Sequence, residues 1–373
     1  MAYTTIDDSS AHFFTKTYSG NGSTNAITND ANAGDFQPDW LWIKTRSHSS
    51  SHRLMDSSRL TSGEATLSLR SEDTAAESDI ANDGMTSLDS NGFSLNGNGS
   101  GGAVNENSKT YVAWQWKANG GSTTSQTGSD INSVTQTNTT SKFSIITYSG
   151  ASNASADGSN NSGAYWRVKH GLGSTPKLAI FRKRNSAAAW YIWHHKLGGT
   201  QEDKHIKLNT QGGVATESDI LFGNTDWSST EFEIGGWDVV NRNGSTYVAY
   251  MFDEVQGYSK FGTFKGNGNA EGPFIYTGFK PAYFIVKATS LSNQQWYVFD
   301  NKRDTVNPIT RQIQPNLNDA ENNVTGAPID FLSNGIKIRN TDGHDNSNGA
   351  TYIYIAFAEH PFVSSKGIPV TAR

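Results

Sequence analysis

Cysteine is absent from this 373-residue chain, and charged residues make up only 17% of it. Without cysteine, disulfide bonds, thiolate metal sites and a cysteine nucleophile are excluded, although the redox compartment stays undecided. The net charge is only −5, and lysine and arginine are spread along the chain rather than clustered. Because nucleic-acid binding needs a concentrated basic surface, we expect no nucleic-acid partner.

Long hydrophobic runs are also missing. No apolar stretch approaches the roughly 20 residues that cross a bilayer as a helix, so we expect no membrane insertion. The first eight residues, Met1 to Asp8, contain neither the basic segment nor the apolar segment of a signal peptide. These features predict a protein made in the cytoplasm and released by a route other than secretion.

Glycine, with 37 copies, and abundant Asn, Ser and Thr indicate many turns. Between these turns one strand pattern recurs three times, each time beginning with Thr-Tyr after an Asn-rich turn. The three copies span residues 110–116, 246–252 and 351–357. Recurrence of a strand and its turn at long, similar spacing is typical of tandem repeats.

Other markers recur in the same order around each copy. They predict a first repeat at residues 1–118, a second at 142–256 and a third, with a C-terminal tail, at 257–373. Asn-Gly pairs between apolar residues, at Asn91-Gly92 and Asn334-Gly335, predict β-hairpins. Residues 119–141 are Gly, Ser, Thr, Gln and Asn with almost nothing apolar, which predicts a flexible or extended linker.

Short strands separated by turns, without a convincing amphipathic helix, predict an all-β protein. We expect three tandem antiparallel β-sandwich domains that are jelly-roll-like. The Thr-Tyr strand carries apolar or aromatic groups on both faces. We therefore expect it in the middle of a sheet, with its Trp and Tyr side chains filling the space between the two sheets.

Candidate metal sites each have a structural alternative. His194 and His195 are adjacent, and adjacent strand residues point to opposite faces, so they are poorly placed to share one ion. The oxygen-rich stretch 342–349 resembles a calcium loop but lacks the closing bidentate Glu, which favours an ordinary polar turn. We expect no metal and no cofactor.

Catalytic patterns are similarly weak. Glu231 and Glu233 share one strand face, which a glycoside hydrolase would tolerate, but a solvated face is the simpler interpretation. No nucleophile elbow, P-loop or dinucleotide fingerprint occurs in the sequence. The sequence predicts no enzyme and no catalytic residue.

Aromatic residues near polar loops are the best candidates for a ligand surface, because flat rings beside amides and carboxylates suit sugars and proteins. The alternative is that these rings belong to the sandwich core. The four candidates are Trp227, Trp237, Trp166 and Tyr165.

The amino-acid sequence of the repeats resembles that of a family of repeat-containing virion structural proteins of tailed phages of marine bacteria. The resemblance lies in the opening residues 1–8, the strands at 37–44 and 111–118, and the closing residues 355–362. The resemblance extends over all three repeats. It concerns the sequences of strands and turns, so it identifies no functional residue in this chain.

This resemblance implies a structural protein of the virion, made in the host cytoplasm. The first expectation is a tail-fibre or appendage subunit, with host attachment through its loops; a capsid decoration or cement protein and a carbohydrate-binding module are the alternatives. Expected partners are other virion proteins, further copies of the chain as a homo-oligomer, and a host-surface glycan or protein.

Overall fold

The computed structural model describes residues 4–29, 35–60, 67–80, 84–97, 103–154, 161–198, 204–217 and 221–360. Within these ranges nearly all regular structure is antiparallel β-sheet, so the predicted all-β sandwich fold is confirmed. The exceptions are a 3-10 turn, η1 (Ser9–Ala11), and one short helix, α1 (Gly343–Asn346). None of the described helices is long and apolar enough to cross a membrane. Most of the predicted C-terminal tail, residues 361–373, lies outside the described residues.

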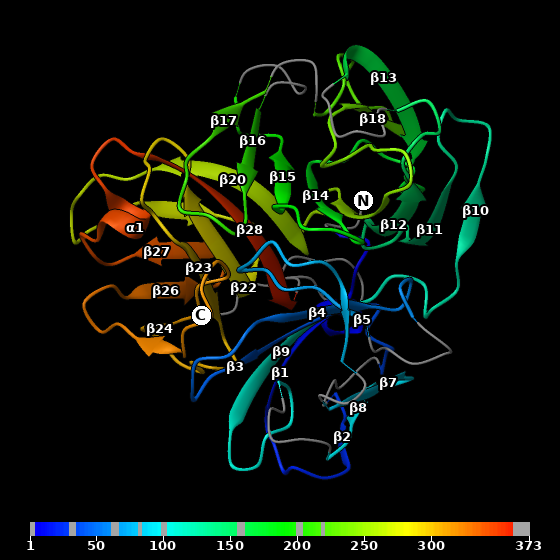
Figure 1. Cartoon of the computed structure of the whole chain (residues 1–373). Coiled ribbons are helices and arrows are strands. Elements are labelled where there is room, and N and C mark those ends of the chain that lie inside the picture. The colour runs from blue at the N-terminus through cyan, green and yellow to red at the C-terminus, as the bar shows by residue number, and fades with distance from the viewer. Residues whose placement is uncertain are drawn as a thin grey trace.

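Each repeat contributes a main sheet in which the Thr-Tyr strand lies between two neighbours. Figure 1 shows the first sheet in blue and cyan, the second in green and the third in yellow to red. The first has the order β1 (Phe13–Ser19), β9 (Thr110–Trp116), β3 (Trp40–Thr45), β4 (Arg53–Asp56). The second contains β12 (Phe143–Ser149), β19 (Thr246–Phe252), β14 (Leu178–Lys183), β15 (Tyr191–His194), β16 (Lys204–Lys207) and β17 (Ala215–Thr216). The third has β20 (Ser259–Lys265), β28 (Thr351–His360), β22 (Lys280–Ala288) and β23 (Trp296–Asp300).

A smaller sheet covers one face of each main sheet. The first and third contain the two predicted Asn-Gly hairpins, which are confirmed. The three small sheets are β2 (Asn25–Ile27), β8 (Gly92–Leu95) and β7 (Met85–Asp89); β13 (Asn161–Lys169) and β18 (Glu231–Gly236); and β21 (Phe274–Tyr276), β27 (Gly335–Ile338) and β26 (Ile329–Leu332). Two-residue pairs complete the sheets: β5 (Leu67–Ser68) with β6 (Ser78–Asp79), and β24 (Arg311–Gln312) with β25 (Asn322–Asn323).

The Thr-Tyr motif ties the strand to the turn before it. The Tyr111 hydroxyl accepts a hydrogen bond from the backbone N–H of Glu106, and Tyr352 accepts one from Ser347 in the same way. The turn also passes so close to the first strand of the sheet that a Cβ at Gly20 would collide with the Glu106 carbonyl oxygen. The glycine at this place and the Thr-Tyr start of the central strand are therefore required by packing.

The two faces of the central strand serve different cores. In β9, Tyr111 and Ala113 pack against the small sheet, whereas Val112, Trp114 and Trp116 face away from it. The prediction of a central strand is confirmed. The expectation that its Trp side chains fill the space between the two sheets is wrong, because they contact the other repeats.

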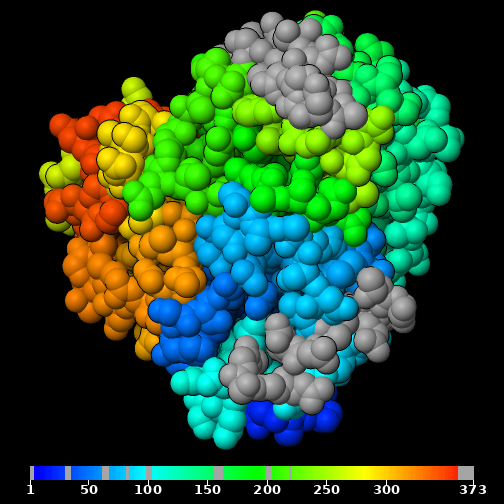
Figure 2. Space-filling model, in the orientation of Figure 1, coloured from blue at the N-terminus to red at the C-terminus, as the bar shows by residue number. Residues whose placement is uncertain are grey.

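All three main sheets turn their second face toward one common hydrophobic core. Trp40 of the first repeat stacks on Tyr250 of the second, with ring centroids 4.4 Å apart and planes 15° apart. Phe13 stacks on Phe357 of the third repeat at 5.2 Å. Figure 1 shows the three units around one centre, and Figure 2 shows them in contact over their surfaces. The three repeats thus form a closed ring around one core rather than a linear row of independent domains.

Residues 119–141, predicted as a flexible or extended linker, instead contribute strands to the second main sheet. This segment contains β10 (Thr124–Gln126) and β11 (Ser133–Asn138), and β11 pairs with β12 along six residues, extending the second main sheet. Its start is anchored by the buried Asp39, whose carboxylate accepts backbone N–H groups from Ala118, Gly120 and Gly121 at 2.7–2.9 Å. Edge strands can be held by backbone hydrogen bonds and β-branched Thr, so few apolar residues are needed.

Candidate functional site

Two of the four predicted ligand-surface aromatics lie in the core of the second repeat. Trp227 is 4% exposed, and its indole N–H donates to the Glu233 carbonyl oxygen at 3.1 Å. Trp166 is 6% exposed and donates to Asn153 Oδ1 at 2.9 Å. These rings pack between the second main sheet and the β13–β18 pair, so neither presents a face to a ligand.

The other two aromatics are half-buried. Trp237 packs against the same cluster, edge-on to Tyr191 with ring centroids 5.4 Å apart. Tyr165 lies next to Trp166 on β13. The structure therefore gathers Trp166, Trp227 and Trp237 around one core and does not assemble the four rings into a surface.

Within the described ranges, no group of three or more His, Asp or Glu side chains converges as a metal site would require. His194 Nε2 contacts the Tyr354 carbonyl oxygen at 3.3 Å, whereas His195 Nε2 contacts that of Phe261 at 2.6 Å. Burial lowers the pKa of His194 to about 3. In the oxygen-rich loop, Asp342 caps helix α1 by accepting the His344 N–H at 2.9 Å.

The two carboxylates Glu231 and Glu233 have separate structural partners. Glu231 accepts from the Ser129 hydroxyl at 2.7 Å. The buried Glu233 accepts backbone N–H groups from Asn224 and Thr225 at 2.8 and 3.2 Å. Each carboxylate is engaged in holding a loop, and the arrangement offers no paired acid and base.

The most elaborate polar construction in the molecule is the set of junctions between repeats. We call them junction A (third and first repeats), junction B (first and second) and junction C (second and third). In each, an irregular segment of one repeat donates a backbone N–H to the end of a main-sheet strand in the next. The three donor–acceptor pairs are Glu321 to Arg46, Glu77 to Arg184 and Val214 to Thr289, at 2.8–2.9 Å.

A second bond recurs at every junction, from a ring at or just before the start of the fourth main-sheet strand. At junction B, Trp190 donates its indole N–H to the Arg70 carbonyl oxygen, and at junction C Trp296 donates to that of Lys207 at 3.0 Å. At junction A the ring is His52, whose Nε2 lies 3.2 Å from the Gln314 carbonyl oxygen. Head-to-tail contacts that repeat three times and return to the first unit define a closed ring.

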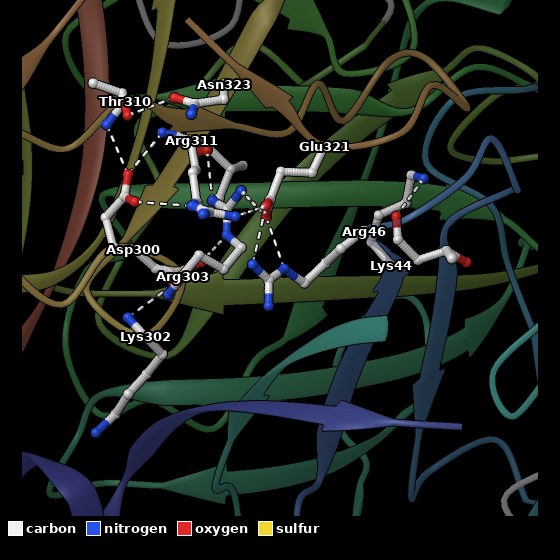
Figure 3. A network of polar contacts seen from close by, with 12 residues as sticks. Lys44, Arg46, Asp300, Lys302, Arg303, Thr310, Arg311, Glu321 and Asn323 are labelled. Atoms are coloured by element: carbon white, nitrogen blue, oxygen red, sulfur yellow. Dashed lines mark hydrogen bonds and ion pairs between the residues drawn. The ribbon is translucent and has the colours of Figure 1, made fainter. Parts of the chain in front are cut away.

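Junction A contains a cluster of three arginines around the glutamate Glu321, whose side chain is only 7% exposed (Figure 3). Glu321 is bound by Arg46 through two contacts at 2.9 and 3.0 Å, by Arg303 at 3.3 Å and by Arg311 at 2.9 Å. In Figure 3, Arg46 and Arg311 approach the carboxylate from different directions. Burial alone would raise the pKa of Glu321. The hydrogen bond from Arg46 and the charge of Arg303 lower it by more than burial raises it, so the pKa lies below the ordinary value.

Junction B repeats this arrangement with different residues. Glu77 is bound by Arg184 at 2.6 Å and by the buried Arg59 at 3.4 Å. Arg59 also pairs with Asp56, which accepts the Tyr250 hydroxyl of the second repeat at 2.6 Å. Two of the three junctions are thus held by an Arg–Glu–Arg group shared between repeats.

Junction C has apolar or neutral residues at the corresponding places: Val214, Thr289 and Leu197. Leu197 packs against the common core. A hydrophobic replacement of a buried ion group can preserve stability, because it avoids the desolvation of the charges. The ring therefore uses two chemical solutions for one geometry.

Each junction also holds a buried cation next to it, on the third main-sheet strand. Burial lowers the pKa of Lys44 to about 8 and that of Lys287 to about 8, while Arg182 falls to a pKa of about 10. Lys44 donates to the Thr45 carbonyl oxygen at 2.9 Å. All three cations are buried.

A surface feature that the sequence analysis missed lies on β21. Phe274 and Tyr276 are 46% and 59% exposed, whereas Ile275 between them is buried in the core of the third repeat. Because alternate strand residues share a face, the two rings form an exposed aromatic pair. An aromatic alternation on a three-residue strand looks like core in the sequence, but the two rings lie on the sheet face opposite to the buried Ile275 and are exposed there.

Comparison with known proteins gives one match. A family model described as "Domain of unknown function (DUF7483)" matches residues 8–361, which is most of the chain and all three main sheets. No curated protein and no solved structure matches the chain.

Proposed function

The chain belongs to the DUF7483 family, and we propose that it is a structural protein of a phage virion, a tail-fibre or appendage subunit that presents loops for host attachment. The observation that carries the proposal is the closed ring of three sheets around one core. A ring whose junctions are held by buried ion groups and backbone hydrogen bonds is a rigid scaffold. Loops on a rigid scaffold are the usual place for recognition of a partner.

The division between shared and differing parts supports the same function. The repeats share their main sheets and junction geometry, while their small sheets and connecting loops differ in length and composition. Three versions of one scaffold can thus offer three different surfaces. The strand sequences that resemble marine phage virion proteins lie in the main sheets, which the three repeats share. Partners of such a subunit are other virion proteins and further copies of the chain.

The proposal is tested on purified phage particles. Mass spectrometry of the particles should detect the chain, and antibodies against the purified protein should slow adsorption to host cells. Purified protein should also bind host cells and compete with the phage. Particles that lack the chain would contradict a virion role, and unchanged adsorption together with no cell binding would contradict attachment.

A capsid decoration protein is a second candidate, favoured by the threefold recurrence of the junctions. A body with this pattern matches a threefold position of a shell, because each repeat meets an equivalent surface there. Antibody labelling on the shell rather than the tail would select this candidate. The third alternative is a carbohydrate-binding module centred on Trp227. The Trp227 ring is buried and cannot contact a sugar.

A further inference from the structure

The exposed Tyr276 ring forms part of the wall of a cleft between the second and third repeats. The cleft has a volume of about 400 Å³, within the range of small-ligand sites. Most of the other residues that line it carry polar side chains and come from both repeats: Lys177, Glu254, Gln256, Ser259, Lys260 and Thr277. Phe274, on the same strand, does not line it.

Ion pairs fix the charged side chains of this cleft in place. The Glu254 carboxylate binds Lys177 at 3.1 Å and Lys260 at 3.3 Å, and it accepts the Phe261 backbone N–H at 2.8 Å. Lys177 also lies 3.5 Å from Asp253. Both lysines remain more than a third exposed, so each ammonium keeps donors for a further partner.

A second cleft, of about 550 Å³, shares Glu254 and Gln256 with the first. It adds Thr4, Thr5, Thr139, Thr140 and Lys142. We call these two adjoining clefts the Tyr276 groove, after the exposed ring that lines the first of them. Along the groove, three lysines (142, 177 and 260) outnumber the single lining glutamate.

We propose that the Tyr276 groove binds an acidic oligosaccharide. A sugar ring stacks on Tyr276, hydroxyl groups meet the threonine hydroxyls and the Gln256 amide, and carboxylate or sulfate substituents meet the lysines. A groove lined by hydroxyl, amide and ammonium groups around one aromatic ring suits a sugar chain better than a peptide, which needs apolar pockets for its side chains. The inference rests on the proposed function and deepens it by naming the chemical class that the attachment surface takes.

Calorimetry with two size-matched probes, hexagalacturonate and maltohexaose, tests the groove on the full chain. The unaltered protein should bind the acidic probe more tightly than the neutral one. Tyr276→Ala should weaken binding of the acidic probe by roughly tenfold, as expected for a lost aromatic contact. Lys260→Gln should reduce the preference for the acidic probe.

Phe274→Ala is the matched control, because Phe274 is exposed on the same strand face outside the groove. It should leave binding of both probes unchanged, and circular dichroism should show native folding for all variants. The inference is overturned if the unaltered protein binds neither probe at millimolar concentration, or if Tyr276→Ala binds as tightly as Phe274→Ala.

The outcomes separate this inference from the proposed function. If the unaltered protein binds host cells but neither probe, the groove is rejected and the attachment role stands. If sugar binding depends on Tyr276 but phage particles lack the chain, the virion role is rejected and the groove stands.

Discussion

Replacing Glu321 by valine, the residue at the corresponding place in junction C, removes the centre of the charged cluster at junction A. The side chain of Glu321 is 7% exposed and binds Arg46, Arg303 and Arg311 at 2.9–3.3 Å. Arg303 has a fully buried side chain and keeps only Asp300 as an ionic partner after the change. Glu321→Val therefore leaves buried positive charge without adequate compensation.

The expected loss in the free energy of unfolding is about 3–5 kcal/mol, the usual cost of removing one partner of a buried ion group. Urea denaturation followed by tryptophan fluorescence measures it, since four tryptophans of the first repeat lie in the common core. The paired variant Arg46→Thr with Glu321→Val removes one uncompensated charge. It should lose less than the sum of the two single changes, with a coupling of roughly 1–3 kcal/mol.

Glu106→Gln is the control, because Glu106 is 41% exposed and its contacts with His48 and Lys109 are at 3.3 and 3.9 Å. An exposed pair of this kind contributes little, so the change should stay within about 0.5 kcal/mol. If Glu321→Val costs no more than Glu106→Gln, or if Arg46 and Glu321 show additive effects, the junction does not depend on this cluster.

Three further predictions concern buried groups and close packing. Burial raises the pKa of Asp345 to about 7, so the folded protein binds this proton more tightly than the unfolded chain does. The free energy of unfolding should therefore fall as pH rises from about 4 to 7. Urea melts at several pH values should show this fall, and Asp345→Asn should abolish it. Burial lowers the pKa of Lys287 to about 8, so stability should rise between about pH 8 and 10, and Lys287→Met should remove this rise. A Cβ at Gly150 would collide with the Arg242 backbone, so Gly150→Ala should cost about 1–3 kcal/mol, whereas Gly326→Ala, which meets nothing within 4 Å, should cost almost nothing in the same melts.

The sequence predicted the repeated strands and both Asn-Gly hairpins, because these depend on local patterns of apolar residues and turns. The common core was not predicted. Alternating apolar residues such as Tyr111 and Trp114 are equally compatible with a central strand in one sandwich and with a strand between two cores. Residues 119–141 were misjudged because edge pairing uses backbone hydrogen bonds, which leave no apolar pattern.

The candidate site was harder to predict for a related reason. Trp227 stands among polar loop residues, yet its indole N–H reaches a backbone carbonyl oxygen, which makes burial affordable. Phe274 and Tyr276 have the alternation of a buried strand, and their exposure follows from the outer sheet face that they share, opposite to the core residue Ile275. Junction residues such as Glu77 and Arg184 are far apart in sequence and meet only because the first and second repeats pack against each other.

Cryo-electron microscopy of the intact phage particle tests the central proposal most directly. The account predicts three-lobed density on a tail fibre or other appendage, into which the ring of three sheets fits with its loops directed outward. A particle reconstruction that accounts for every appendage and capsid protein without this three-lobed body would contradict the proposed virion role.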